Sequence, residues 1–135
     1  MPLYLSLDEV VEINRDVMKK YGGVSRIRDK AALESCIALP TTIVFGYERF
    51  GTLAEKAAAY CFFISQNQPF QDGNKRTAFA SALHFLHLNT DLRHINEIEM
   101  FETIVAVAEH SATIEDLTKL FDYGCSTPEP NENAS

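Results

Sequence analysis

The sequence has 135 residues, 46% of them hydrophobic and 23% charged, which predicts one globular domain. A formal net charge of −7 disfavours a broad basic surface, so we expect no direct nucleic-acid partner. No apolar run approaches the roughly 18 residues that a membrane helix needs, and no basic start with a long apolar stretch signals secretion, so we expect a cytoplasmic protein with no membrane partner.

Two helices are predicted in the first forty residues. The first covers residues 6–23, where Ser6 and Glu9 have the spacing of a capping box. The second covers residues 28–40, with Asp29 as its N-cap.

An extended segment is predicted next, over residues 41–51. Its side chains are mostly β-branched or aromatic, and Gly46 and Gly51 interrupt them, which is typical of a small hairpin. Residues 52–67 then predict a helix that is apolar on nearly all sides, as expected of a buried central helix. Residues 74–90 predict a second long helix whose first turns carry small side chains.

Two further helices and a tail complete the chain. Residues 95–110 predict a helix capped by Asn96, and residues 112–124 predict the last helix. The stretch 124–135 has no hydrophobic pattern, and we expect it to be disordered. The predicted fold class is therefore all-α: a helical bundle over residues 1–123, with a short extended or β-hairpin flap before its central helix.

The three cysteines are Cys36, Cys61 and Cys125. They are widely spaced and form no CxxC pair, so we expect free thiols in a reducing compartment.

The stretch "NQPFQDGNKRTA", residues 67–78, separates the two long helices. Phe70 is apolar in a polar loop, and we expect it to anchor the loop in the core. Asp72 and Gly73 allow a sharp reversal, and the next helix begins near Asn74. The free N–H groups of a helix N-terminus behind such a turn make a natural anion site.

Two cations and one carboxylate add to this loop. Lys75 and Arg76 bring positive charge to the same helical turn, and Asp72 can hold a Mg²⁺ ion that bridges phosphate oxygens. The same residues also fit an ordinary loop with solvated cations, and the stretch does not match the Walker A pattern. Judged from the residues alone, the loop is a phosphate-binding candidate.

The longer stretch "QPFQDGNKRTA" resembles the signature loop of the Fic/Doc family, usually HPFx[D/E]GN followed by Gly or Lys and then Arg. The flanking stretches "GTLAEKAAAYCFFI" and "RIRDKAALESCIALP" are similar to segments of Doc-like proteins, and the resemblance covers roughly residues 4–121. It implies a Fic-type fold over residues 1–123. It also implies that Gly73, Asn74, Lys75 and Arg76 bind ATP phosphates, that Asp72 holds Mg²⁺, and that a flap aligns the target protein. The flap residues are Ile43, Val44, Phe45, Gly46 and Tyr47.

Two departures from the usual Fic pattern favour the Doc branch. Lys75 stands where AMP-transferring members carry a second glycine, and Phe79 stands where they carry a second arginine. Doc-like toxins transfer the γ-phosphoryl group of ATP to a translation factor, elongation factor Tu, and arrest translation. A separate antitoxin holds them silent, so the resemblance implies an antitoxin as partner.

The catalytic histidine of the family is replaced by Gln68. A glutamine can hydrogen-bond but has no useful basicity near neutral pH, and general base catalysis contributes about 10²- to 10⁴-fold in rate. His84 and His87 lie on the second long helix, roughly 15 and 20 Å beyond Asn74, so neither can replace the missing base. His94 and His110 fall in other segments that the sequence does not place.

Three interpretations of Gln68 remain open: a toxin inactivated by substitution, a natural relative that kept only partner binding, or a reaction in which the base is less essential. The function predicted is that of a Doc-like kinase with impaired activity. The alternatives are an AMP-transferring enzyme and a catalytically dead module that binds an antitoxin.

Overall fold

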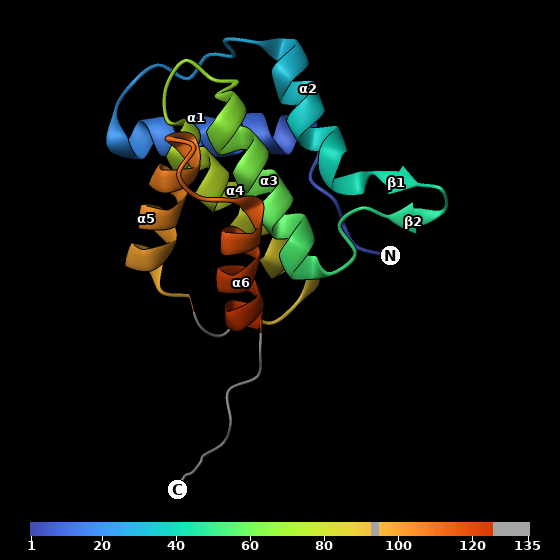
Figure 1. Cartoon of the computed structure of the whole chain (residues 1–135). Coiled ribbons are helices and arrows are strands. Elements are labelled where there is room, and N and C mark those ends of the chain that lie inside the picture. Colours follow the sequence, from blue (N-terminus) through green and yellow to red (C-terminus); the bar gives the residue numbers. More distant parts are fainter. Residues whose placement is uncertain (93–94, 126–135) are drawn as a thin grey trace, which may run out of the picture.

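The structure is a computed structural model, and it describes residues 1–92 and 95–125. In this part of the chain, helices dominate and one small hairpin is the only sheet, which confirms the predicted all-α class (Figure 1). The helices are α1 (Leu7–Tyr21), α2 (Lys30–Ala38), α3 (Leu53–Asn67), α4 (Asn74–Asn89), α5 (Glu97–Ala108) and α6 (Ile114–Cys125), with a 3-10 turn over Leu39–Thr41.

The helix starts follow from their capping residues, as predicted. Ser6 accepts a hydrogen bond from the Glu9 amide at 3.1 Å, and the Glu9 carboxylate accepts one from the Ser6 amide at 2.7 Å. The carboxylate of Asp29 accepts from the amide of Ala32 at 3.0 Å, which starts α2.

Helix α3 is the centre of the bundle, because it contacts α2, α4, α5 and α6. Tyr60, Cys61 and Ile64 on this helix are fully buried. The Tyr60 ring lies 5.3 Å from that of Phe85 on α4, and its hydroxyl accepts a hydrogen bond of 2.9 Å from the Leu5 amide. The predicted buried central helix is thus confirmed.

The flap is a hairpin of two very short strands, β1 (Ile43–Val44) and β2 (Tyr47–Glu48), joined through Phe45 and Gly46. Both joining residues have positive φ, as the tight turns of two-residue hairpins require. The extended region is shorter than the predicted 41–51, because Thr41 belongs to the 3-10 turn. The hairpin projects from the bundle beside α2 and α3 (Figure 1).

Helix α6 extends to Cys125, so the prediction that the last helix ends at residue 124 was short by one residue. Gly124 lies inside the helix and is buried. The rest of the predicted tail, residues 126–135, lies outside the described residues. No helix in the described part is long and apolar enough to cross a membrane.

Candidate active site

The loop between α3 and α4 begins at Gln68, which has φ 48° and ψ 61° and so lies in the left-handed region. Its amide donates to the Ile64 carbonyl at 3.1 Å, which ends α3. Its carbonyl accepts two hydrogen bonds from the Arg28 guanidinium, one of them 3.1 Å from Nε. The backbone at this position is therefore fixed from both sides, while the Gln68 side chain is exposed.

Residues 24–29, which link α1 to α2, pair with this loop like a short strand. Ile27 and Phe70 form an antiparallel bridge, and the Gln71 amide donates to the Arg26 carbonyl at 2.8 Å. Phe70 is 1% exposed and belongs to the core. The loop is thereby held to the body of the protein by both backbone pairing and an apolar side chain.

The side chain of Asn74 closes the loop on itself. Its Oδ1 accepts from the Phe70 amide and its Nδ2 donates to the Phe70 carbonyl, both at 2.9 Å. Sequence reasoning placed Asn74 among the phosphate-binding residues, and the structure adds that its amide group already shapes the turn. What it offers an anion most directly is its backbone N–H at the start of α4.

Asn14 on α1 bonds to the loop and to the start of α4, and it was not among the site residues predicted from the sequence. Its side chain is completely buried and donates hydrogen bonds of 3.0 Å to the Asp72 carbonyl and to the Thr77 hydroxyl. Its Oδ1 accepts from Ser25 at 2.9 Å. The feature of the sequence that could have indicated Asn14 is its place as a polar residue within the apolar stripe of α1.

The N-terminus of α4 is left without a side-chain cap. Gly73 is its N-cap residue, with φ 76°, and no side chain bonds to the free amides there. A Cβ atom at this position would meet Met18 Cε at 2.2 Å, so a larger residue requires the Met18 side chain to move as well as a positive φ that favours glycine. Uncapped amides and the positive end of the helix dipole face outward at this point.

Arg76 lies in the first turn of α4 with its guanidinium stacked on aromatic rings. It is 3.8 Å from the ring centroid of Tyr21 and 5.3 Å from that of Phe101. Such cation–π contacts hold the side chain near the helix start without neutralising its charge.

A cavity of about 480 Å³ gathers most of the predicted site. Asp72, Gly73, Asn74, Lys75 and Arg76 line one wall of it. The end of α1 and Phe101 complete the lining. Gln68, Phe70 and the flap do not line this cavity.

The Asp72 carboxylate is the acidic group on this cavity, and it suits a magnesium ion held jointly with phosphate. Its Oδ2 accepts from the Val24 amide at 2.9 Å, which leaves the other oxygen available. The described residues contain no cluster of three or more metal-binding side chains. A single carboxylate with free helix amides beside it matches the way Mg²⁺ is bound through substrate phosphates, and not a cage that binds metal alone.

The flap lies at the other end of the central helix. Its strands lead into the N-terminal end of α3, whereas the loop follows the C-terminal end. At a rise of 1.5 Å per residue, these ends are roughly 20 Å apart along the helix. The side chains of Ile43, Phe45 and Tyr47 are 65%, 96% and 79% exposed.

Three other titratable side chains of the bundle do not line this cavity. Asn67 donates to the Cys36 sulfur at 3.7 Å, and burial raises the pKa of this thiol to about 11, so it stays protonated at neutral pH. His110 shares a contact of 3.3 Å with the side chain of Gln66 near the end of α3, and its imidazole is exposed. His84 lies 3.8 Å from Glu9 on α1, and His94 is outside the described residues.

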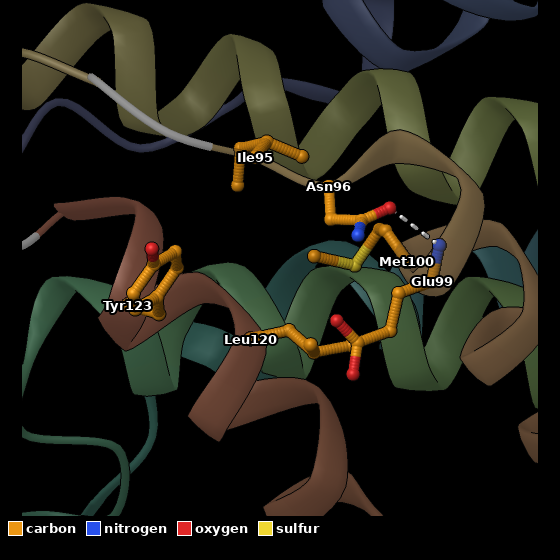
Figure 2. Close-up of a pocket in the computed structure, with 6 residues that line it drawn as sticks. All are labelled: Ile95, Asn96, Glu99, Met100, Leu120 and Tyr123. Carbon is orange, nitrogen blue, oxygen red and sulfur yellow. Dashed lines mark hydrogen bonds between the residues drawn. The ribbon is translucent and has the colours of Figure 1, made fainter.

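A second, separate cavity of about 580 Å³ lies between α5 and α6 (Figure 2). Figure 2 shows the hydrogen bond by which Asn96 caps α5, from the Glu99 amide at 3.0 Å. Met100, Leu120 and Tyr123 also line this cavity, and no residue of the loop does. It therefore has no part in the site built around α4.

Sequence comparison with known proteins finds similarity to a family model and to two named relatives. The family model described as the Fic/DOC family matches residues 4–86. A protein named Toxin Doc from Mycolicibacterium smegmatis is 41% identical over 69 residues, which are 51% of this chain and 53% of that protein. A protein named Protein kinase doc from Escherichia phage P1 is 33% identical over 86 residues, 64% of this chain and 68% of that protein. The chain thus spans about half the length of the first relative and two thirds of the second.

Proposed function

This chain belongs to the Fic/DOC family, and we propose that it is a Doc-like toxin scaffold whose reaction is transfer of the ATP γ-phosphoryl group to a hydroxyl of a protein. The observation that carries the proposal is the single cavity in which Asp72, Lys75 and Arg76 meet the uncapped start of α4. One carboxylate, two cations and free amides are the groups that phosphoryl transfer uses for positioning and charge stabilisation.

Each residue on the cavity has a role in this proposal. Asp72 would hold Mg²⁺ together with the phosphates, and the ion would neutralise charge on the phosphate oxygens. The backbone amides at Asn74 and Lys75 bind phosphate oxygens at the helix start. Arg76 leaves its place on Tyr21 to contact the γ-phosphoryl group, and Lys75 neutralises a second oxygen.

Kinase chemistry is favoured over AMP transfer by the residue one turn further along α4. Phe79 is part of the apolar packing and lines a neighbouring cavity of about 360 Å³. An apolar ring there cannot clamp a second phosphate, which the resemblance to AMP-transferring members would require. Modified target protein should therefore gain a phosphate and not a nucleotide.

Gln68 makes this chain a weak enzyme in the proposal. The side chain can orient an attacking hydroxyl but cannot take its proton, and the loss of a general base costs about 10²- to 10⁴-fold in rate. Its exposed position and its backbone bonds to Ile64 and Arg28 mean that a histidine at position 68 needs no rearrangement of the loop.

The target protein is proposed to lie along α3 from the flap to the loop. An extended segment of about six residues spans the roughly 20 Å between them. The exposed backbone of the flap offers edge pairing to such a segment. The target class that the resemblance implies is a translation factor of the elongation factor Tu type, and the regulatory partner is an antitoxin.

The test uses radiolabelled ATP with purified elongation factor Tu and three forms of the protein: the chain as it stands, Gln68→His, and Gln68→His with Arg76→Ala. We expect strong labelling only from Gln68→His, and a mass gain equal to one phosphate. A mass gain of a whole AMP would establish the AMP transferase instead. Absence of any transfer by Gln68→His would contradict the enzymatic proposal.

A second candidate function is favoured by Gln68 itself: a module that binds an antitoxin without catalysis. In that case Arg76→Ala leaves antitoxin affinity unchanged, and expression of Gln68→His does not arrest bacterial growth. Growth arrest by Gln68→His, absent with Arg76→Ala added, would exclude this second function for the scaffold.

A further inference from the structure

Lys56, in the first turns of α3, is a buried lysine, and burying a charged ammonium group costs free energy. Its side chain is 1% exposed, and among the described residues it is the only buried one that carries a charge. The other buried residues in this part of α3 are alanines and one tyrosine, namely Ala54, Ala57, Ala58, Ala59 and Tyr60.

All the partners of the Lys56 ammonium lie in the flap or in the segment that joins the flap to α3. Nζ lies 2.7 Å from the carboxylate of Glu48 in β2. It donates to the carbonyl of Phe50 and lies 3.4 Å from the carbonyl of Gly51. One side chain of the central helix thus contacts three residues, 48, 50 and 51, at the base of the hairpin.

The stability of α3 does not account for this lysine. Burying an ammonium group costs several kcal/mol even after relaxation, and exchanging buried charged groups for apolar side chains of similar volume is often neutral or stabilising. Methionine has nearly the same length and would fill the same space. The charge of Lys56 is therefore explained by its bonds to the flap and to the segment after it, and not by the packing of the helix.

The flap needs a contact with the body of the protein to fix its orientation. It contains two residue pairs, Ile43 with Glu48 and Val44 with Tyr47, and isolated hairpins are at best marginally stable. Its strand residues are exposed, so burial of its own side chains does not orient it. Nearby, Arg49 stacks on the ring of Phe50 at 4.9 Å, which secures the segment just after β2.

We propose that Lys56 is a positioning residue that sets the orientation of the flap relative to α3, and thereby the path of the target segment toward the loop. This inference rests on the proposed function, because the flap is taken to align a protein substrate. Lys56 does not touch the phosphate cavity, so its loss should weaken use of the target protein and leave ATP binding intact.

The experiment compares Lys56→Met with Lys119→Met, both made in the Gln68→His protein. Lys119 is an exposed lysine on α6 and controls for the change in net charge. We expect Lys56→Met to raise the KM for the target protein at least tenfold with an unchanged KM for ATP, and Lys119→Met to change neither. Glu48→Gln removes the ion pair from the half-exposed side, so it remains informative if Lys56→Met folds poorly. It should raise the same KM to a smaller degree.

Flap motion is measured on the same proteins by ¹⁵N relaxation of the amides of Val44 to Glu48. The heteronuclear NOE should fall in Lys56→Met and stay unchanged in Lys119→Met. An unchanged NOE in Lys56→Met, or a target KM that stays constant while the flap becomes mobile, would overturn the inference. Lack of transfer by the Gln68→His parent would refute the proposed function instead, and the NOE would still decide whether Lys56 anchors the flap.

Discussion

The side-chain amide of Asn14, buried on α1, donates a hydrogen bond of 3.0 Å to the backbone carbonyl of Asp72 in the loop. The same amide reaches the Thr77 hydroxyl in the second turn of α4. One side chain therefore sets the distance between the N-terminal helix, the carboxylate-bearing turn and the start of α4. The geometry of the cavity lined by Asp72 and Arg76 depends on this residue although it does not line the cavity itself.

Replacing Asn14 by Ala should lower both stability and ATP affinity. The change leaves a part-buried carbonyl and a buried hydroxyl without their donor, which costs about 2–3 kcal/mol of the free energy of unfolding. It also frees the Asp72 turn, so we expect ATP affinity to fall at least tenfold. Urea unfolding and isothermal titration calorimetry measure the two quantities.

Asn89→Ala is the control for that change. Asn89 bonds to the backbone of Leu3 and Phe85 at the far end of α4, where it is partly exposed. Its loss should cost about 1 kcal/mol of stability and no ATP affinity. Equal loss of ATP affinity in the two variants would show that Asn14 has no specific effect on the loop.

Gly73→Ala should destabilise the protein more than Gly46→Ala. Both glycines have positive φ, 76° and 83°, so alanine carries a backbone cost of about 1 kcal/mol at either position. Only at Gly73 does the new Cβ collide with Met18, since nothing lies within 4 Å of a Cβ at Gly46. We expect at least ~1 kcal/mol more loss in urea unfolding for Gly73→Ala. Equal losses would mean that Met18 moves aside freely.

Alkaline pH should destabilise the fold in part through Tyr60. Burial raises the pKa of its hydroxyl to about 12 from an ordinary value of 10.0, because the charged form is poorly solvated in the core. The unfolded chain therefore loses this proton first, and stability present below pH 10.0 is lost as the pH rises toward about 12.

Tyr60→Phe isolates that contribution, because it keeps the ring and removes the titrating group. Below pH 10 the variant should be about 1 kcal/mol less stable, through loss of the hydrogen bond from Leu5. Its unfolding free energy should decline less steeply between pH 10 and 12. Parallel pH profiles for the two proteins would contradict the assignment.

We expect the three cysteines to react with a thiol reagent at different rates, because their exposure to solvent differs. Burial raises the pKa of all three thiols, but Cys36 and Cys61 are fully buried, whereas Cys125 is partly exposed at the end of α6. An aromatic disulfide reagent at neutral pH should modify one thiol rapidly in the native protein and three in denaturant. Cys125→Ser should abolish the rapid phase. A rapid phase that persists would place one of the other thiols at the surface.

Much of the fold could be predicted because its signals are local. Capping residues such as Ser6 and Asp29 lie within three positions of the amides they bind, and the apolar character of α3 reflects its central place. The sequence could indicate the loop as a candidate anion site because its turn and its cations are adjacent in the chain, and that role stays a prediction.

The supporting contacts could not be predicted, because they join distant parts of the chain. Asn14 and Asp72 are 58 positions apart, and nothing in a helical stripe says what one polar member will bind. Lys56 reads as a surface residue in "AEKAAAY", and only the path of the chain from the flap back to α3 encloses it. Asn74 was predicted to bind phosphate, and the sequence did not indicate that its side chain also bonds to the backbone of Phe70, four residues earlier.

The backbone of Gln68 is fixed by Ile64 and Arg28 without help from its own side chain. The folded state is therefore indifferent to whether this position carries glutamine or histidine. Codons for these two amino acids differ by one nucleotide, so the exchange takes one mutational step and needs no second change to rescue folding. Under the proposed function, selection on activity and selection on folding would act on this position independently.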